Sequence, residues 1–198
     1  MPAPIEVQAL VEKFKADADY YTSSIYNETQ TINEFIKPLF TQLGWDFENS
    51  KNVIVESRLY VEENGDERAK HPDIAFRIGN NIRFYLEAKK PSEDLSRAKN
   101  AFQVRRYGWT QGLPLCVLTD FEEFIIYSCK IKPNKNDKPH IERLASYSYE
   151  DYIEKWDEIE QLFSYSAVQS GSLENYVEIK NIFGSLSVDE GFLREMER

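Results

Sequence analysis

Apolar residues recur at every second position on both sides of a turn signal in the middle of the chain. The alternating positions are Ile74, Phe76, Ile78, Ile82, Phe84 and Leu86. Between the two runs, Gly79-Asn80-Asn81 is typical of a tight turn. Because side chains alternate between the two faces of a strand, this pattern predicts a β-hairpin with a strongly apolar face.

Apolar residues at helical spacing predict helices before and after the hairpin. We expect helices at about residues 5–20, 32–43, 92–111 and 149–163, with Gly44 ending the second and Pro38 kinking or breaking it. Shorter apolar runs at 53–61, 115–119 and 124–129 predict further strands. The expected fold class is therefore α/β, with a mixed central β-sheet flanked by helices.

The length of 198 residues suits one domain, or one domain with a linker. We expect a compact domain over residues 1–166 and a connector over 167–198. Cys116 and Cys129 lie in apolar runs, which favours reduced core cysteines over a disulfide framework or zinc site. No apolar run approaches bilayer length and no stretch resembles a signal peptide, so we expect a cytoplasmic protein without membrane contact.

The formal net charge of −10 argues at first against binding to nucleic acid. The distribution weakens that objection, because residues 95–140 carry eight Lys or Arg against four Asp or Glu, while residues 141–198 carry five against thirteen. A lysine-rich loop at 130–139 lies in the basic part. Contact with DNA and simple solubility are equally good interpretations of that loop.

One end of the hairpin carries the candidate chemistry. Antiparallel pairing brings Asp73 beside Glu87 and Lys89, which share one face of the second strand. Two close carboxylates repel each other, and a divalent cation relieves the repulsion. Oxygen ligands from Asp73, Glu87 and the main-chain carbonyl of Ala88 suit Mg²⁺, with Lys89 free to orient or deprotonate a water or to stabilise the phosphorane. An exposed hairpin end held by salt bridges is the alternative interpretation.

At these residues the chain resembles the PD-(D/E)XK nuclease superfamily, with Pro72-Asp73 and Glu87-Ala88-Lys89 in the motif positions. The resemblance implies a restriction-endonuclease-like core. It also implies a DNA endonuclease that uses Mg²⁺, which Mn²⁺ can replace, to hydrolyse phosphodiester bonds with an activated water. A catalytically silent module of the same fold, kept for DNA binding or assembly, is the alternative function.

The helix that ends at Gly44 resembles the opening helix of the nuclease domain in Type I restriction subunits and fused restriction-modification enzymes. An acid on that helix completes the metal site in those proteins, and Glu28 occupies the matching place. Glu34 is the competing acid. Because Thr31-Ile32-Asn33-Glu34 is typical of a capping box, we expect Glu34 to have a structural role and Glu28 to be the ligand.

Gln103 and Tyr107 lie four residues apart on the helix that follows the hairpin, and therefore on one face. This Gln-x-x-x-Tyr pattern resembles the motif of the exonuclease-like and Type I restriction branch of the superfamily. The resemblance implies that both residues help to position DNA or the catalytic Lys89. An ordinary helix with a half-buried tyrosine is the alternative.

The last residues resemble a connector that leads into an adenine-methyltransferase domain, over Ser185-Leu186-Ser187-Val188-Asp189-Glu190-Gly191-Phe192-Leu193-Arg194. We therefore expect the front module of a longer prokaryotic restriction-modification polypeptide, of Type IIG or Type I. Its expected partners are double-stranded DNA and C-terminal methyltransferase, specificity or motor modules. Cutting both strands with one active site per chain predicts a transient dimer.

Overall fold

A mixed six-stranded sheet forms the centre of the computed structural model, which describes residues 2–57, 59–63 and 66–182. Its strands in spatial order are β1 (Val53–Val55), β4 (Ile74–Ile78), β5 (Asn81–Ala88), β6 (Leu115–Thr119), β7 (Glu123–Ser128) and β8 (Arg143–Ser148). Neighbouring strands are antiparallel except β5 and β6, which are parallel. The expected α/β fold with a mixed central sheet is confirmed.

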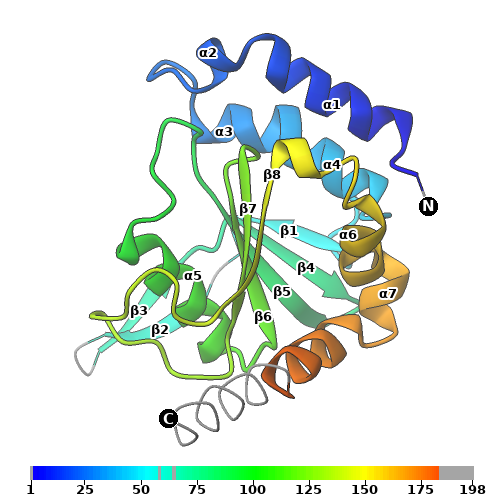
Figure 1. Cartoon of the computed structure of the whole chain (residues 1–198). Coiled ribbons are helices and arrows are strands. Elements are labelled where there is room, and N and C mark those ends of the chain that lie inside the picture. Colours follow the sequence, from blue (N-terminus) through cyan, green and yellow to red (C-terminus); the bar gives the residue numbers. More distant parts are fainter. Residues whose placement is uncertain (1, 58, 64–65, 183–198) are drawn as a thin grey trace, which may run out of the picture.

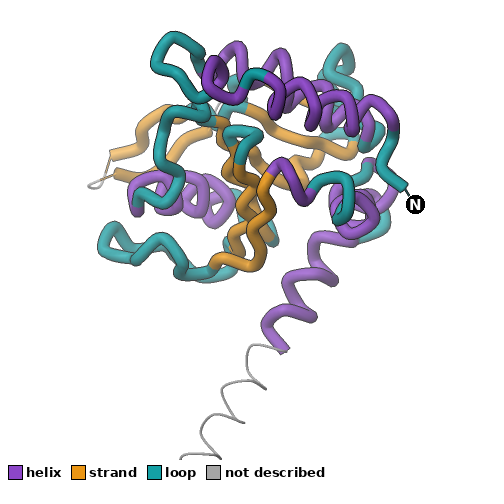
Figure 2. The backbone as a smooth tube through the Cα atoms, turned by 45° about the horizontal axis from the view of Figure 1, so that its top comes forward, coloured by secondary structure: helices purple, strands orange, loops and turns teal. Residues whose placement is uncertain are grey.

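Helices cover both faces of this sheet (Figures 1 and 2). One face carries α1 (Ile5–Ala16), α2 (Ala18–Tyr21), α3 (Glu28–Thr31), the π-helical segment η1 (Ile32–Ile36), α4 (Lys37–Gln42) and α6 (Trp156–Phe163). The other face carries α5 (Ala98–Thr110). The chain also contains the 3₁₀ turn η2 (Tyr149–Asp151), α7 (Tyr165–Gln169) and a final helix at residues 172–182.

The run expected to form one strand at 53–61 is divided between two sheets. Glu56 has a left-handed backbone with φ of 54°, and its N–H donates to the carbonyl of Asp73 at 2.7 Å. The chain leaves the main sheet there, and β2 (Leu59–Glu63) pairs with β3 (Asp66–Lys70) as a separate antiparallel pair. The single-strand prediction is therefore wrong.

The second predicted helix is irregular directly before Pro38, where a kink or a local break was expected. The preceding segment η1 is π-helical, and the Lys37 N–H donates to the carbonyl of Ile32, five residues back. This wider turn accommodates a ring that would otherwise meet the carbonyl four residues earlier. The N-terminal capping box is formed by Asn27 and Gln30, so the capping box predicted at Thr31–Glu34 is wrong.

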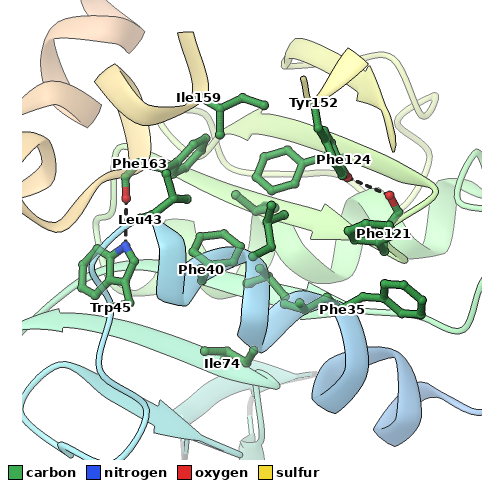
Figure 3. Packing of buried hydrophobic residues seen from close by; sticks show 14 of the residues in the cluster. Phe35, Phe40, Leu43, Trp45, Ile74, Phe121, Phe124, Tyr152, Ile159 and Phe163 are labelled. Atoms are coloured by element: carbon green, nitrogen blue, oxygen red, sulfur yellow. Dashed lines mark hydrogen bonds between the residues drawn. The ribbon is translucent and has the colours of Figure 1, made fainter. Parts of the chain in front are cut away.

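A large apolar cluster fills the space between the sheet and the helices on the α4 side (Figure 3). Phe76 and Phe84 stack at its base with ring centroids 4.3 Å apart. The Trp45 indole N–H donates to the carbonyl of Phe163 at 2.8 Å, and this bond links α6 to the loop after α4. The cluster therefore holds β4 and β5 firmly in register with the layer above them.

The packed part of the chain extends beyond the boundary expected at residue 166. Val168, Leu173 and Val177 are buried members of the same cluster, so α7 and the next helix belong to the folded body. The predicted connector at Ser185–Arg194 lies outside the described residues. Within the described ranges, no helix combines the length and the hydropathy needed to span a bilayer.

Candidate active site

The β4–β5 hairpin places the predicted acids side by side. Ile74 pairs with Leu86 in the register of the two strands, so Asp73 lies beside the end of β5 that carries Glu87. The side chain of Asp73 is fixed by the main chain of β5, because its Oδ2 accepts the Ala88 N–H at 2.7 Å. The turn and the alternation explain the pairing of the two strands, and a register shift between Phe76 and Arg77 completes this arrangement.

Lys89 places its ammonium group among the oxygens at this hairpin end. Its Nζ donates to Glu87 Oε1 and to the carbonyl of Ala88, both at 2.8 Å, and lies 3.6 Å from Glu28 Oε2. The main chain of Lys89 is held as well, since its N–H donates to the carbonyl of Thr119 on the neighbouring parallel strand at 2.9 Å. Two of the expected metal-ligand oxygens are thus bonded to an internal cation.

Helix α5 supplies the third side of the site. Gln103 Nε2 donates a short hydrogen bond to Glu87 Oε1 and a second bond to the Tyr107 hydroxyl at 3.1 Å. The spacing of four residues puts both side chains on the helix face that packs on β5. The structure therefore brings Gln103 to the same carboxylate that Lys89 contacts, with Tyr107 bonded to Gln103 behind it.

Burial makes this cluster electrostatically costly. Glu87 is 2% exposed, and its Oε2 has no hydrogen-bond partner among the described residues. Burial, followed by the charge of Asp73, raises the pKa of Glu87 to about 8. Burial also raises the pKa of Asp73 to about 6, against the effect of its bond from the Ala88 N–H. Both shifts indicate that further positive charge would be bound favourably here.

The pKa of Lys89 is raised although the side chain is largely buried. Loss of solvent works against its charged form, but Glu87, Glu28 and Asp73 together raise the pKa of Lys89 above its ordinary value. The ammonium form therefore persists at neutral pH.

Glu28 is the helix acid that the structure brings to the site. It is the first residue of α3, directly after the cap residue Asn27, and it faces Lys89. Glu34 instead forms an ion pair with Lys13 of α1, with Nζ and Oε2 2.8 Å apart. Of the two acids considered for the metal site, Glu28 is therefore the one that lies near Lys89. Glu34 has a structural contact, but this contact is an ion pair and not the expected cap.

Comparison with known proteins adds a second line of observation. The chain is 38% identical over 198 residues to the "Type II restriction enzyme and methyltransferase RM.Eco57I" of Escherichia coli. This chain is similar to one segment of a restriction enzyme. The match covers 96% of the chain and 20% of the relative, so the chain spans about one fifth of that protein's length. No family model and no solved structure matches it.

One further acid near the site was missed in the sequence. The charge of the exposed Glu56 contributes to the raised pKa of Asp73, and the left-handed backbone of Glu56 turns the chain at this edge of the sheet. A glutamate in an alternating run gives no signal for such a turn, so the pattern alone could not have found it.

The carboxylates are not arranged as a finished metal site. Within the described ranges, no group of three or more His, Cys, Asp or Glu side chains could hold a metal ion as it stands. Lys89 lies between the acids of β5 and α3 and bonds to the oxygens that would face a cation. Chemically, the cluster offers oxygen ligands, one persistent ammonium group and a neutral amide donor.

Proposed function

We propose that this chain is a PD-(D/E)XK nuclease domain of a restriction-modification enzyme, which hydrolyses DNA phosphodiester bonds with the help of Mg²⁺. The observation that carries the proposal is the buried Glu87, which shares one hairpin end with Asp73 and Lys89 and has an unbonded carboxylate oxygen. The similarity to part of a Type II restriction enzyme and methyltransferase supports the same activity class.

The residues at the hairpin end fit a magnesium ion. A buried carboxylate oxygen without a partner is costly unless a cation or donor meets it, and Glu87 Oε2 is such an atom. Asp73, Glu87, the carbonyl of Ala88 and Glu28 form an all-oxygen donor set of the kind that Mg²⁺ prefers and Mn²⁺ accepts. When bound, the ion would supply positive charge next to the reacting phosphate and acidify a water.

Lys89 has the properties of an electrostatic catalyst. Because its pKa is raised, the side chain stays charged at neutral pH and can donate to a phosphate oxygen or orient the attacking water. Its persistent charge argues against a role as general base. We therefore assign Lys89 to stabilising the negative charge that develops in the transition state.

Gln103 is a positioning residue in this mechanism. It donates to Glu87 Oε1 and to the Tyr107 hydroxyl, so it fixes the orientation of the carboxylate. Glu87 Oε2 keeps no hydrogen-bond partner among the described residues. Tyr107 is 4% exposed and orders Gln103 from the helix side. Both residues thereby determine how rigidly the acid is presented.

The larger protein context is also a proposal. The printed name of the relative combines restriction and methylation, which favours a single-chain Type IIG arrangement over a Type I subunit. We infer double-stranded DNA as substrate, methyltransferase and specificity modules as partners, transient pairing for double-strand cuts, and a prokaryotic cytoplasm as the location.

A catalytically silent module for DNA binding or assembly is the second candidate. It is favoured by the bonds of Lys89 to Glu87 and Ala88, which leave no finished metal group in the described residues. This candidate predicts no metal-dependent cleavage by any version of the protein.

Plasmid cleavage in Mg²⁺ or Mn²⁺ distinguishes the two candidates. Lys89→Ala should reduce cleavage by about 10²-fold or more, because it removes a charge aimed at the transition state. Binding to DNA should remain within about twofold, since one contact contributes little to a phosphate-dominated affinity. The control Lys51→Ala removes an exposed lysine elsewhere and should cleave like the wild type. Full cleavage by Lys89→Ala would refute the assigned role.

A further inference from the structure

A lysine-rich loop with four exposed lysines connects β7 to β8. We call residues 130–138 the lysine loop. Its exposed lysines are Lys130, Lys132, Lys135 and Lys138. None of them forms an ion pair with an acid in the described part of the chain. In a protein of net charge −10, this loop carries four lysines and one acid and is therefore locally positive.

The only acid of the lysine loop, Asp137, forms an ion pair with a buried arginine. Asp137 Oδ2 accepts a bond from Arg105 Nη1 at 2.8 Å, and Arg105 is 1% exposed. The same oxygen accepts the Asn134 N–H at 2.9 Å. The charge of Asp137 is therefore offset by a buried arginine, and the lysines face solvent without an acidic neighbour in the loop.

Several contacts fix the shape of this loop. Pro133 is buried. The Tyr127 hydroxyl on β7 donates to the carbonyl of Pro139 at 2.9 Å, just beyond the loop. Lys132 lies over the ring of Trp109, with Nζ 5.1 Å from the ring centroid. A positive surface that is ordered before binding loses less entropy when a ligand binds.

Helix α5 joins the lysine loop to the candidate active site. Gln103 contacts Glu87 from this helix, Arg105 holds Asp137, and Trp109 underlies Lys132. Six residues of helix rise about 9 Å, which is well within one duplex turn of about 34 Å. Figures 1 and 2 both show α5 and the connection from β7 to β8 on the same side of the molecule.

We propose that the lysine loop is a second DNA contact, which binds backbone phosphates of the duplex whose scissile phosphate lies at the Glu87 cluster. This inference rests on the proposed nuclease function and extends it. Lysine ammonium groups bind phosphates as point charges and carry no base specificity. The lysine loop therefore adds affinity and fixes the approach of the duplex, independently of any recognition sequence.

The test compares two triple variants with the same change of charge. The loop variant is Lys130→Gln, Lys135→Gln and Lys138→Gln, which leaves Lys132 on Trp109 and the Arg105–Asp137 pair intact. The control variant is Lys15→Gln, Lys51→Gln and Lys180→Gln, all exposed positions on other elements. Binding of the 198-residue chain to a fluorescent duplex is measured by anisotropy over a salt series in EDTA, and thermal melts confirm that both variants fold.

The loop variant should bind about tenfold more weakly at ~100 mM salt. The slope of log Kd against log salt should fall by about 2 to 3, since each lost phosphate contact removes about 0.9. The control should stay within about twofold of the wild type. Equal weakening in both variants, or none in the loop variant, would overturn the inference.

A cleavage assay at low salt separates this inference from the proposed function. Metal-dependent cleavage by the wild type, together with unchanged DNA binding by the loop variant, would refute the lysine loop alone. Absence of both DNA binding and cleavage by the wild type at low salt would refute the proposed function and the inference together.

Discussion

The eight residues of strand β5 alternate between two faces that have different surroundings. On one face, Phe84 and Leu86 enter the aromatic cluster, where Phe84 stacks on Phe76 of β4. On the other face, Tyr85 packs into the second apolar cluster, and Glu87 beside it is equally buried but has one carboxylate oxygen without a partner among the described residues. Apolar packing explains Phe84, Leu86 and Tyr85. It does not explain Glu87, so Glu87 points to function.

Breaking the apolar face should give the largest loss of stability. Phe84→Ala removes a ring that is fully buried against Phe76, Phe40 and Phe163, and should lower the free energy of unfolding by about 3–5 kcal/mol. Phe102→Ala, on the partly exposed side of α5, is the matched control and should cost about 1 kcal/mol or less. Urea unfolding measures both.

Equal losses in these two variants would contradict the comparison, because a partly exposed ring would then stabilise as much as a buried one. Cleavage by whatever fraction of Phe84→Ala remains folded should be normal, since the ring packs in the apolar cluster on the face of β5 opposite Glu87.

Asp120 tests whether a buried acid alone is a sign of function. It is 3% exposed in the turn between β6 and β7, and its Oδ1 accepts the Glu123 N–H at 2.7 Å. Burial raises the pKa of Asp120 to about 8. Because its pKa is raised in the folded state, Asp120 binds its proton more tightly in the folded protein than in the unfolded chain. The protonated carboxyl therefore stabilises the fold at low pH, and this contribution is lost as the pH rises towards 8.

Asp120→Asn keeps the accepting oxygen and removes the titration. Its thermal midpoint should exceed that of the wild type by an amount that grows from pH 5 to pH 8 and reaches several degrees. Cleavage should be unchanged, in contrast to any change at Glu87. A midpoint difference that is constant over this pH range would show that Asp120 does not titrate as described.

The part of the fold that was predictable rests on local periodicity. Alternation and the turn at Gly79–Asn81 predicted the antiparallel pairing of β4 and β5 that brings Asp73 close to Glu87 and Lys89, but they did not predict the register shift between Phe76 and Arg77. The helical spacing of Gln103 and Tyr107 likewise predicted their shared face. These site residues were therefore found together from the sequence, while their chemical roles remain proposals.

The features that the sequence did not predict depend on contacts that form only in the packed structure, which the hydrophobic pattern does not specify. Two consecutive capping boxes, at 27–30 and 31–34, fit the spacing before α4, and only the packed structure selects the box that begins at Asn27. The break at Glu56 is a positive φ without a glycine. Gly108 is a further example, because an added Cβ would lie 2.3 Å from Cys129 Sγ and 2.4 Å from Cys116 Sγ, a constraint that exists only once α5 has docked.

The central claim is that the polar face of β5 binds a divalent cation through Glu87. Calorimetric titration of Mn²⁺ into the 198-residue chain tests it most directly, with wild type, Glu87→Gln and the exposed control Glu48→Gln compared with and without a short duplex. We predict that wild type and control bind Mn²⁺ and that Glu87→Gln binds it at least about tenfold more weakly. Glu87→Gln should keep its thermal stability at pH 7.5, because the carboxylate that it replaces has a pKa of about 8. Equal Mn²⁺ binding by Glu87→Gln and wild type would contradict the account.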